Sequence, residues 1–199
     1  MHRRHAFLGL ASALAVPALL GPAVAQNTPS PTADRTGNTG ARMGEAEARY
    51  AADTLAAGAL ALAASRLALK KGKDDDVKEF AGFEVAEQET IADILKAMRD
   101  QTVPPSGQVK APSEAEVTGQ LDAKGKAMIE ALESAKAGSA FDREYIRGQI
   151  EGHRALLQIQ ETYLSTGKDR ETLAVAKLAR GQIKEHLVLL ADIEDDLKG

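Results

Sequence analysis

Two histidines and two glutamates are the side chains whose types and spacing could do chemistry. His153 and His186 each have an isoleucine three residues before them and a leucine four residues after them. On a helix, each imidazole would therefore share one face with apolar side chains. Glu84 and Glu87, three residues apart, belong to another apolar stripe with helical spacing. Because imidazole nitrogens and carboxylate oxygens bind zinc and iron, these four residues could hold a single Zn or Fe ion.

A polar network without metal is the interpretation that the same pattern favours. Arg66 lies in a stripe made of Leu55, Ala59, Leu62, Arg66 and Leu69. On a helix Arg66 would thus face inward, toward Glu84. Buried ionisable groups need partners, since an unpaired polar group in an apolar interior costs free energy. The predicted network consists of Arg66, Glu84, His153 and His186. It would fix the register of the helices, and it requires no cofactor.

A dimetal carboxylate centre is not predicted. Such a centre in a helical bundle needs two Glu-x-x-His pairs and two further glutamates. Here Glu151 precedes His153 by two residues and Glu185 precedes His186 by one. On a helix, neither glutamate would share the face of its histidine. The chain also has no cysteine for thiol chemistry. We therefore expect no catalytic residues and lean toward a protein that is not an enzyme.

Four long amphipathic segments must position these side chains. Their apolar residues recur at spacings of three and four, which predicts helices. The predicted helices cover about Glu45–Lys71, Asp75–Asp100, Phe141–Leu164 and the residues after Asp169 to about Leu197. Short turns join the first pair and the last pair. No segment alternates with a period of two, so we expect no sheet.

The long connection between the two helix pairs is rich in proline. Thr102–Pro112 contains three prolines and a glycine, which forbid a helix there. A capping box beginning at Ser113 starts a weaker helical stretch that ends near Lys136, with interruptions predicted at Gly119 and Gly125. The economical fold is an all-α four-helix bundle of two antiparallel hairpins, with a crossover connection that contains a short extra helix.

The N-terminal residues indicate export. Residues 1–25 combine a basic start, a short apolar middle and an Ala-x-Ala end, the pattern of a signal peptide cleaved after Ala25. Residues 26–44 are rich in Pro, Thr, Gly and Asn and predict a flexible polar linker before the bundle domain at residues 45–199. We expect a periplasmic or extracellular protein, exported by the general secretory route rather than the twin-arginine route.

Composition limits the partners. The formal net charge of −4 argues against nucleic acid, whose phosphates require a clustered excess of Lys and Arg. Without cysteine the chain has no site for a lipid anchor on an N-terminal cysteine. The apolar part of the leader is shorter than the roughly 20 residues of a membrane span, so no transmembrane segment is expected. The Ala-rich stretch Leu55–Ala64 could pack in the core or form a homo-oligomer interface.

The order of landmarks resembles a family of exported bacterial proteins, domain of unknown function 4142 (DUF4142). The matching motifs are Lys78–Ala81, Phe141–Tyr145, Gly152–His153, the Gly-Lys-Asp turn at 167–169, and His186. The resemblance spans roughly Ala46 to Leu197 and implies a ferritin-like bundle and export, without an established activity. Members of the family commonly carry an acidic residue followed by histidine in the second helix. This chain has Glu87–Gln88 there, which argues against a metal site shared with the family.

Three functions remain open at this point. The first is a non-catalytic binding or envelope-stress accessory protein with an unknown ligand. The second is a metal-binding or redox protein that uses Glu84, Glu87, His153 and His186 inside the bundle. The third is a structural module that oligomerises through the first helix. The sequence does not indicate the ligand, the oligomeric state or the biological process.

Overall fold

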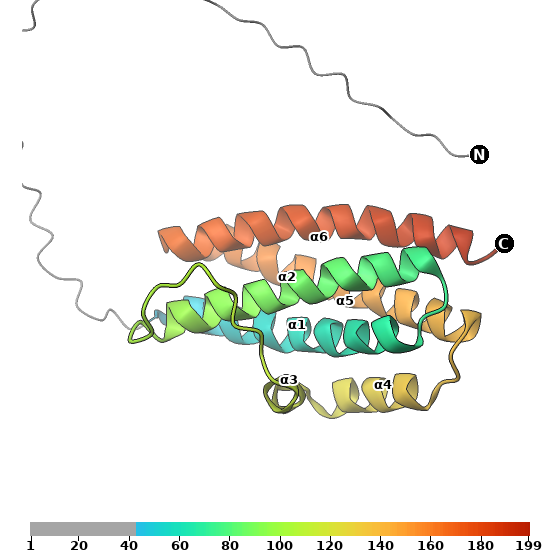
Figure 1. Ribbon diagram of the computed structural model, residues 1–199. Helices are drawn as coiled ribbons and strands as arrows, with labels where there is room; N and C mark the ends of the chain where they lie inside the picture. Colours follow the sequence, from blue (N-terminus) through green and yellow to red (C-terminus); the bar gives the residue numbers. More distant parts are fainter. Residues whose placement is uncertain (1–42) are drawn as a thin grey trace, which may run out of the picture. The chain divides into compact units, whose positions relative to one another are not determined.

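The computed structural model describes residues 43–199. The predicted signal peptide (1–25) and all but the last two residues of the predicted linker (26–44) lie outside the described residues. The described part contains six helices and no strand (Figure 1). They are α1 (Glu45–Lys71), α2 (Asp75–Arg99), α3 (Glu114–Gln120), α4 (Ala123–Ser134), α5 (Ser139–Thr166) and α6 (Arg170–Asp196). The all-α class and the four long helices predicted from the sequence are confirmed.

Side-chain caps fix where four of these helices begin. The Asp74 carboxylate accepts the backbone N–H groups of Asp76 and Val77 at the start of α2. Ser113 and Glu116 form the predicted capping box of α3, while Asp122 and Asp169 cap α4 and α6. Each cap satisfies backbone donors that have no partner inside the helix.

The break within the crossover differs from the prediction. Gly119 lies inside α3 and Gly125 lies inside α4, so neither glycine interrupts a helix. The interruption falls at Leu121–Asp122, because the Asp122 side chain accepts the N–H of Gly125 and starts a new helix. The crossover therefore contains two short helices rather than one.

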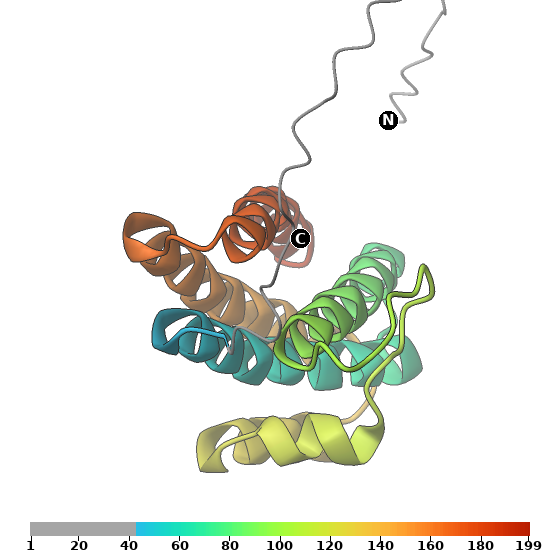
Figure 2. The same ribbon diagram turned by 90° about the vertical axis from the view of Figure 1, so that its left-hand side faces the viewer.

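The four long helices form two antiparallel hairpins. α1 packs along α2, α5 packs along α6, and α1 also packs along α5, so the hairpins share a long interface. α2 and α6 approach each other at few positions. Figures 1 and 2 show the four helices side by side, with the α3–α4 crossover running along the outer side of α1. The predicted hairpins and crossover are confirmed.

α1 is packed from both sides. Ala59 and Leu62 contact Val117 and Leu121 of the crossover, while α2 and α5 cover the opposite side. Of the stretch Leu55–Ala64, only Ala56 is exposed. The Ala-rich stretch is thus occupied within its own chain, and a homo-oligomer through it stays a prediction without support from an open apolar face.

The length and apolar composition of α1 would suffice to cross a membrane, and α1 is the one helix in the described residues for which this holds. The same composition is required of a helix that packs against four others, as α1 does here. The predicted lack of a transmembrane segment therefore stays a prediction.

Two apolar clusters fill the bundle, one toward each end. One surrounds Phe80, Tyr145 and Leu190, and the other surrounds Leu95 and Tyr163. On α2, α5 and α6, the polar residues singled out by the sequence lie between the members of these clusters. Their ionisable groups are therefore held near the middle of the bundle, away from its ends.

Candidate metal centre

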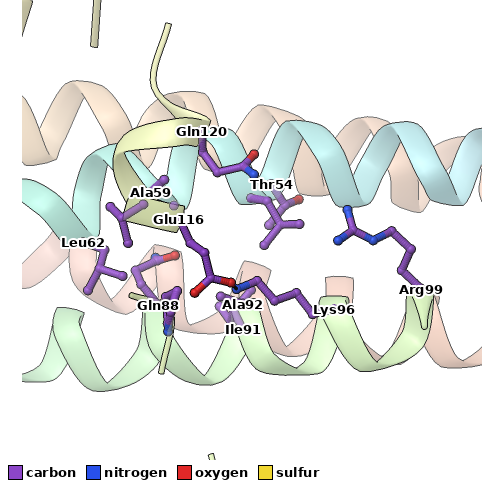
Figure 3. A pocket seen from close by; sticks show the side chains of 15 residues that line it. Thr54, Ala59, Leu62, Gln88, Ile91, Ala92, Lys96, Arg99, Glu116 and Gln120 are labelled. Atoms are coloured by element: carbon purple, nitrogen blue, oxygen red, sulfur yellow. Dashed lines mark hydrogen bonds and ion pairs between the residues drawn. The ribbon is translucent and has the colours of Figure 1, made fainter. Parts of the chain in front are cut away.

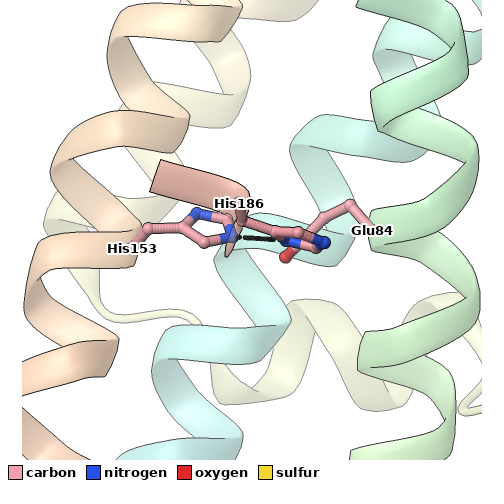
Figure 4. A group of neighbouring side chains, drawn as sticks. All are labelled: Glu84, His153 and His186. Carbon is pink, nitrogen blue, oxygen red and sulfur yellow. Dashed lines mark hydrogen bonds and ion pairs between the residues drawn. The ribbon is translucent and has the colours of Figure 1, made fainter. Parts of the chain in front are cut away.

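Three helices bring one ionisable side chain each to a common point. Glu84 comes from α2, His153 from α5 and His186 from α6 (Figure 4). Their exposed fractions are 0%, 1% and 5%. These three residues therefore face inward, as the apolar stripes of the sequence predicted. The three side chains lie together without access to bulk water.

The three nearest atoms form an almost equilateral triangle. Glu84 Oε2 lies 3.2 Å from His153 Nε2 and 3.1 Å from His186 Nδ1. The two nitrogens are 3.1 Å apart. A tetrahedral ion with bonds of ~2.0 Å keeps its nitrogen and oxygen ligands about 3.3 Å apart. The spacing therefore fits a small ion slightly above the plane of the three atoms.

Groups outside the triangle hold the far nitrogens of both imidazoles. His153 Nδ1 lies 2.8 Å from the backbone carbonyl of Gln149, so this nitrogen carries a proton and donates it. His186 Nε2 lies 3.3 Å from Glu87 Oε1, an ion-pair contact that favours a proton on this nitrogen as well. Metal-binding histidines in proteins are commonly oriented by such contacts, which leave the near nitrogen with a free lone pair.

The carboxylate of Glu84 is held on one side only. Its Oε1 accepts a hydrogen bond of 2.9 Å from Gln88 Nε2. Its Oε2 has no well-aligned hydrogen bond with any described residue, although both imidazoles are close. A buried carboxylate oxygen between two ring nitrogens requires a positive charge at that point, either a proton or a metal ion.

The charges of the metal-free site follow from these contacts. Burial alone would raise the pKa of Glu84, but its contacts with His153 and His186 lower it to about 2. Burial would likewise lower the pKa of His186, but its contacts with Glu84 and Glu87 raise it to about 9. Near neutral pH, Glu84 is therefore an anion and His186 a cation, whose Nδ1 donates a hydrogen bond of 3.1 Å to His153 Nε2.

An aromatic ring closes one side of the site. The centroid of the Phe80 ring lies 5.8 Å from that of His153 and 5.1 Å from that of His186. Tyr145, whose ring centroid lies 6.4 Å from that of Phe80, is itself held by a hydrogen bond of 2.8 Å between its Oη and Ser65 Oγ. The Phe80 ring shields the imidazoles from water on its side of the site.

Sequence reasoning missed the groups that orient the triangle. Gln88 lies four residues after Glu84, a spacing at which helical side chains meet, so its residue type was an available signal. His153 is held by the backbone carbonyl of Gln149, one turn earlier, a contact that any residue at position 149 could supply. Phe80 was quoted within a family motif, without a role at the site.

Glu87 and Arg66 do not lie where the sequence analysis placed them. Glu87 contacts the outer nitrogen of His186, so it does not reach the point where the other three residues meet. Arg66 is not part of the network. Its guanidinium binds Glu89 at 2.9 Å, Glu114 at 2.8 Å and the carbonyl of Pro112 at 3.0 Å. The stripe of Arg66 faces the crossover, which covers α1 on that side.

Comparisons with known proteins agree with this architecture. The family profile described as Domain of unknown function (DUF4142) matches residues 32–193. A DUF305 fragment from Deinococcus radiodurans is 16% identical with a TM-score of 0.62, covering 78% of this chain and 99% of its own. A DUF305 protein from Streptomyces coelicolor, described as inferred to be secreted, is 17% identical with a TM-score of 0.63, covering 77% and 93%. At these identities the likeness shows the fold alone. No curated protein matches the chain.

Proposed function

Because this chain belongs to the DUF4142 family, whose description assigns no activity, we propose a function from the site itself: the bundle binds one Zn²⁺ or Fe²⁺ ion through Glu84, His153 and His186. The convergence of the three ligand atoms, each 3.1 to 3.2 Å from the other two, carries this proposal. The lack of an aligned hydrogen bond at Glu84 Oε2 among the described residues supports it.

The set of donor atoms narrows the choice of metal. One carboxylate oxygen and two imidazole nitrogens are the ligands of many zinc sites and of non-haem iron(II) sites. None of the three donors is sulfur, which soft ions such as Cu⁺ prefer. Three protein ligands leave at least one position for water or another molecule. The outer contacts of His153 and His186 would strengthen both imidazoles as ligands.

Metal binding and protonation compete at this site. The proton on His186 Nδ1 and the proposed ion would need the same lone pair, so an ion must displace that proton to bind. The Glu84 carboxylate stays charged in the metal-free and in the metal-bound site, and it lies next to the positive charge in both. The proposed function thus requires no rearrangement of the helices, only exchange of one positive charge for another.

Metal titration of the purified protein tests the proposal. Residues 26–199 are freed of metal with a chelator, dialysed, and titrated with Zn²⁺ or, anaerobically, with Fe²⁺. We expect one equivalent of ion to bind, and Glu84→Gln to weaken binding by more than the 10–100-fold typical of outer contacts. Glu89→Gln is the matched control on α2, since Glu89 pairs with Arg66 away from the site.

Binding of less than about a tenth of an equivalent by the unaltered protein would contradict the metal function. The protonated His186 and Glu84 would then form a structural ion pair, as in the metal-free network of the sequence analysis. Equal affinities of the Glu84→Gln and Glu89→Gln variants would place any bound ion elsewhere.

We further propose that the protein is exported and acts in the periplasm or outside the cell. The leader pattern of residues 1–25 supports export, and the structurally similar Streptomyces coelicolor protein is described as inferred to be secreted. Mass spectrometry of the mature protein from a periplasmic fraction tests this proposal. The expected N-terminal residue is Gln26, and an intact Met1 would contradict cleavage after Ala25.

A further inference from the structure

A cavity outside the candidate metal site lies between α1, α2 and α3. Its volume is about 270 Å³, and Figure 3 shows the side chains that line it. The apolar lining consists of Leu55, Ala59, Leu62, Ile91, Ala92 and Val117. Polar side chains, among them Thr54, Glu116 and Gln120, make up much of the remaining lining. A cavity that combines apolar lining with polar groups at defined positions is a usual form of a small-molecule site.

One end of the cavity carries a buried amide. Gln88 is only 6% exposed, and its Nε2 is already used by Glu84. Its Oε1 lies against Gly58, where an added Cβ would collide with it. Glycine at position 58 thus leaves room for this amide, whose oxygen lies against the backbone of α1 and closes this end of the cavity.

The other end of the cavity carries two cations from α2. Lys96 pairs with Glu116 of α3 at 2.7 Å. Arg99 has no ion pair with any described side chain and is exposed. Figure 3 shows Arg99 at one end of the row of lining side chains and Gln88 toward the other end, near Ala59 and Leu62. Glu116 neutralises Lys96, so among the lining side chains Arg99 adds one net positive charge, with the Asp100 carboxylate next to it outside the lining.

The distance between the two ends sets the length of a ligand. Gln88 and Arg99 are eleven residues apart on one helix, which corresponds to about 16 Å at a rise of ~1.5 Å per residue. Lys96 is about 12 Å from Gln88 by the same measure. A compact or branched molecule would leave part of such a length unfilled, whereas an extended chain would contact the apolar lining throughout.

We propose that this cavity binds an unbranched amphiphile with an anionic headgroup. The apolar chain lies between α1, α2 and α3 with its end toward Gln88, and the headgroup lies at Arg99. A chain of about ten carbons fits both the length and the volume. The headgroup can be a carboxylate or a phosphate, since Arg99 pairs with either. The amphiphile and the proposed ion would bind at different places, because Glu84, His153 and His186 do not line the cavity.

Calorimetric titration with three ten-carbon probes tests this proposal: decanoate, decyl phosphate and decanol. We expect saturable binding of one molecule of an anionic probe, with decanol at least about tenfold weaker. Comparing decanoate with decyl phosphate identifies the preferred headgroup. Ala92→Phe should abolish binding of all three probes by filling the cavity. Arg99→Glu should weaken only the anionic probes, to about the affinity of decanol.

Arg154→Glu is the matched control, because Arg154 is an exposed arginine on α5 outside this cavity. It should bind the probes as the unaltered protein does. Lack of saturable binding, or equal binding by the Arg99→Glu and Arg154→Glu variants, would overturn the proposal. If Ala92→Phe loses its helical circular dichroism signal, the exposed Arg99 position still decides the outcome. A metal titration in parallel would separate failure of this site from failure of the metal site.

Discussion

At the scale of single residues, the proton on His186 determines how the proposed metal site should respond to pH. The contacts with Glu84 and Glu87 raise the pKa of His186 to about 9 against the effect of burial. Below that pH, an incoming ion must displace the proton from Nδ1. Apparent affinity should therefore rise about tenfold per pH unit between pH 7 and 9, with about one proton released per ion.

Calorimetry in buffers with different ionisation enthalpies would count the released proton directly. In Glu87→Gln the outer contact of His186 is weaker, so its pKa should fall and the pH dependence should flatten at a lower pH. A zinc affinity that stays constant from pH 7 to 9 would show that the ion does not compete with this proton.

The same pKa predicts the stability of the metal-free protein. A group whose pKa is higher in the folded than in the unfolded state stabilises the fold fully below its unfolded pKa. For His186, this contribution is present below about pH 6.5 and is lost as the pH rises to about 9. It amounts to at most about 3 kcal/mol. Urea unfolding in the presence of chelator should therefore give a lower free energy of unfolding at pH 9 than at pH 6.5.

His186→Gln provides the comparison for that experiment, since it removes the titrating group. Its free energy of unfolding should be lower near pH 6.5 and should change less between pH 6.5 and 9. An equal alkaline loss in both proteins would assign the effect to other groups. On the acid side, the pKa of about 2 for Glu84 predicts a separate loss of stability as the pH falls below about 4.5.

The sequence predicted some of these residues but not their roles. Periodicity placed Glu84, His153 and His186 on inward faces, because each lies on a helix with one apolar face, and that face packs into the bundle. Arg66 was misplaced because α1 is buried on two sides, so its stripe faces the crossover rather than the centre. Spacing alone also gave Glu84 and Glu87 equal weight. Only the direction of each side chain separates the inner contact from the outer one.

At the scale of helices and turns, Asp142 connects the two hairpins. It is the second residue of the Phe141–Tyr145 motif on α5 and is only 1% exposed. Its carboxylate accepts the backbone N–H groups of Lys73 at 3.1 Å and Asp74 at 3.2 Å. Both donors lie in the turn between α1 and α2. One carboxylate thus holds the turn of the first hairpin against the start of the second.

Asp142→Ala should lower the free energy of unfolding by about 2 kcal/mol, because it removes a buried carboxylate that accepts two backbone N–H groups. Asp75→Ala, at an exposed carboxylate in the same region, should cost less than about 0.5 kcal/mol. Urea unfolding monitored by circular dichroism would measure both variants. Equal midpoints for the two would show that the carboxylate of Asp142 does not stabilise the turn.

Helix ends were predictable where local chemistry decides them. Basic residues and Gly72 ended α1, and acidic residues began α2, close to the predicted bounds. Inside the crossover the glycines were a misleading signal, since Gly119 and Gly125 are both helical and the break follows from the cap at Asp122. A glycine costs a helix only about 1 kcal/mol relative to alanine, which tertiary contacts can offset.

At the scale of the whole molecule, the candidate metal site lies where two of the long helices, α2 and α6, have little contact with each other. α2 and α6 approach each other at few positions, and at the site Glu84 and Glu87 of α2 contact His186 of α6. The sequence predicted two hairpins. The three- and four-residue spacing of apolar residues is similar in all four long helices, so it did not predict which helix lies next to which. The site therefore lies at a contact between hairpins that only the folded arrangement defines.

An ion at this site would tie α2 of the first hairpin to α5 and α6 of the second. Ligands that bind only the folded state stabilise it, by about 2.7 kcal/mol at a free concentration of 100 times Kd. For a domain of this size, that gain corresponds to a rise in Tm of about 5 to 10 °C. Calorimetric melting with Zn²⁺ should show this rise in the unaltered protein and in Glu89→Gln, and chelator should reverse it. Glu84→Gln should show no rise, because the tie to α2 is lost. A similar rise in Glu84→Gln would mean that zinc stabilises the bundle from another position, and the two hairpins would then be held together by packing alone.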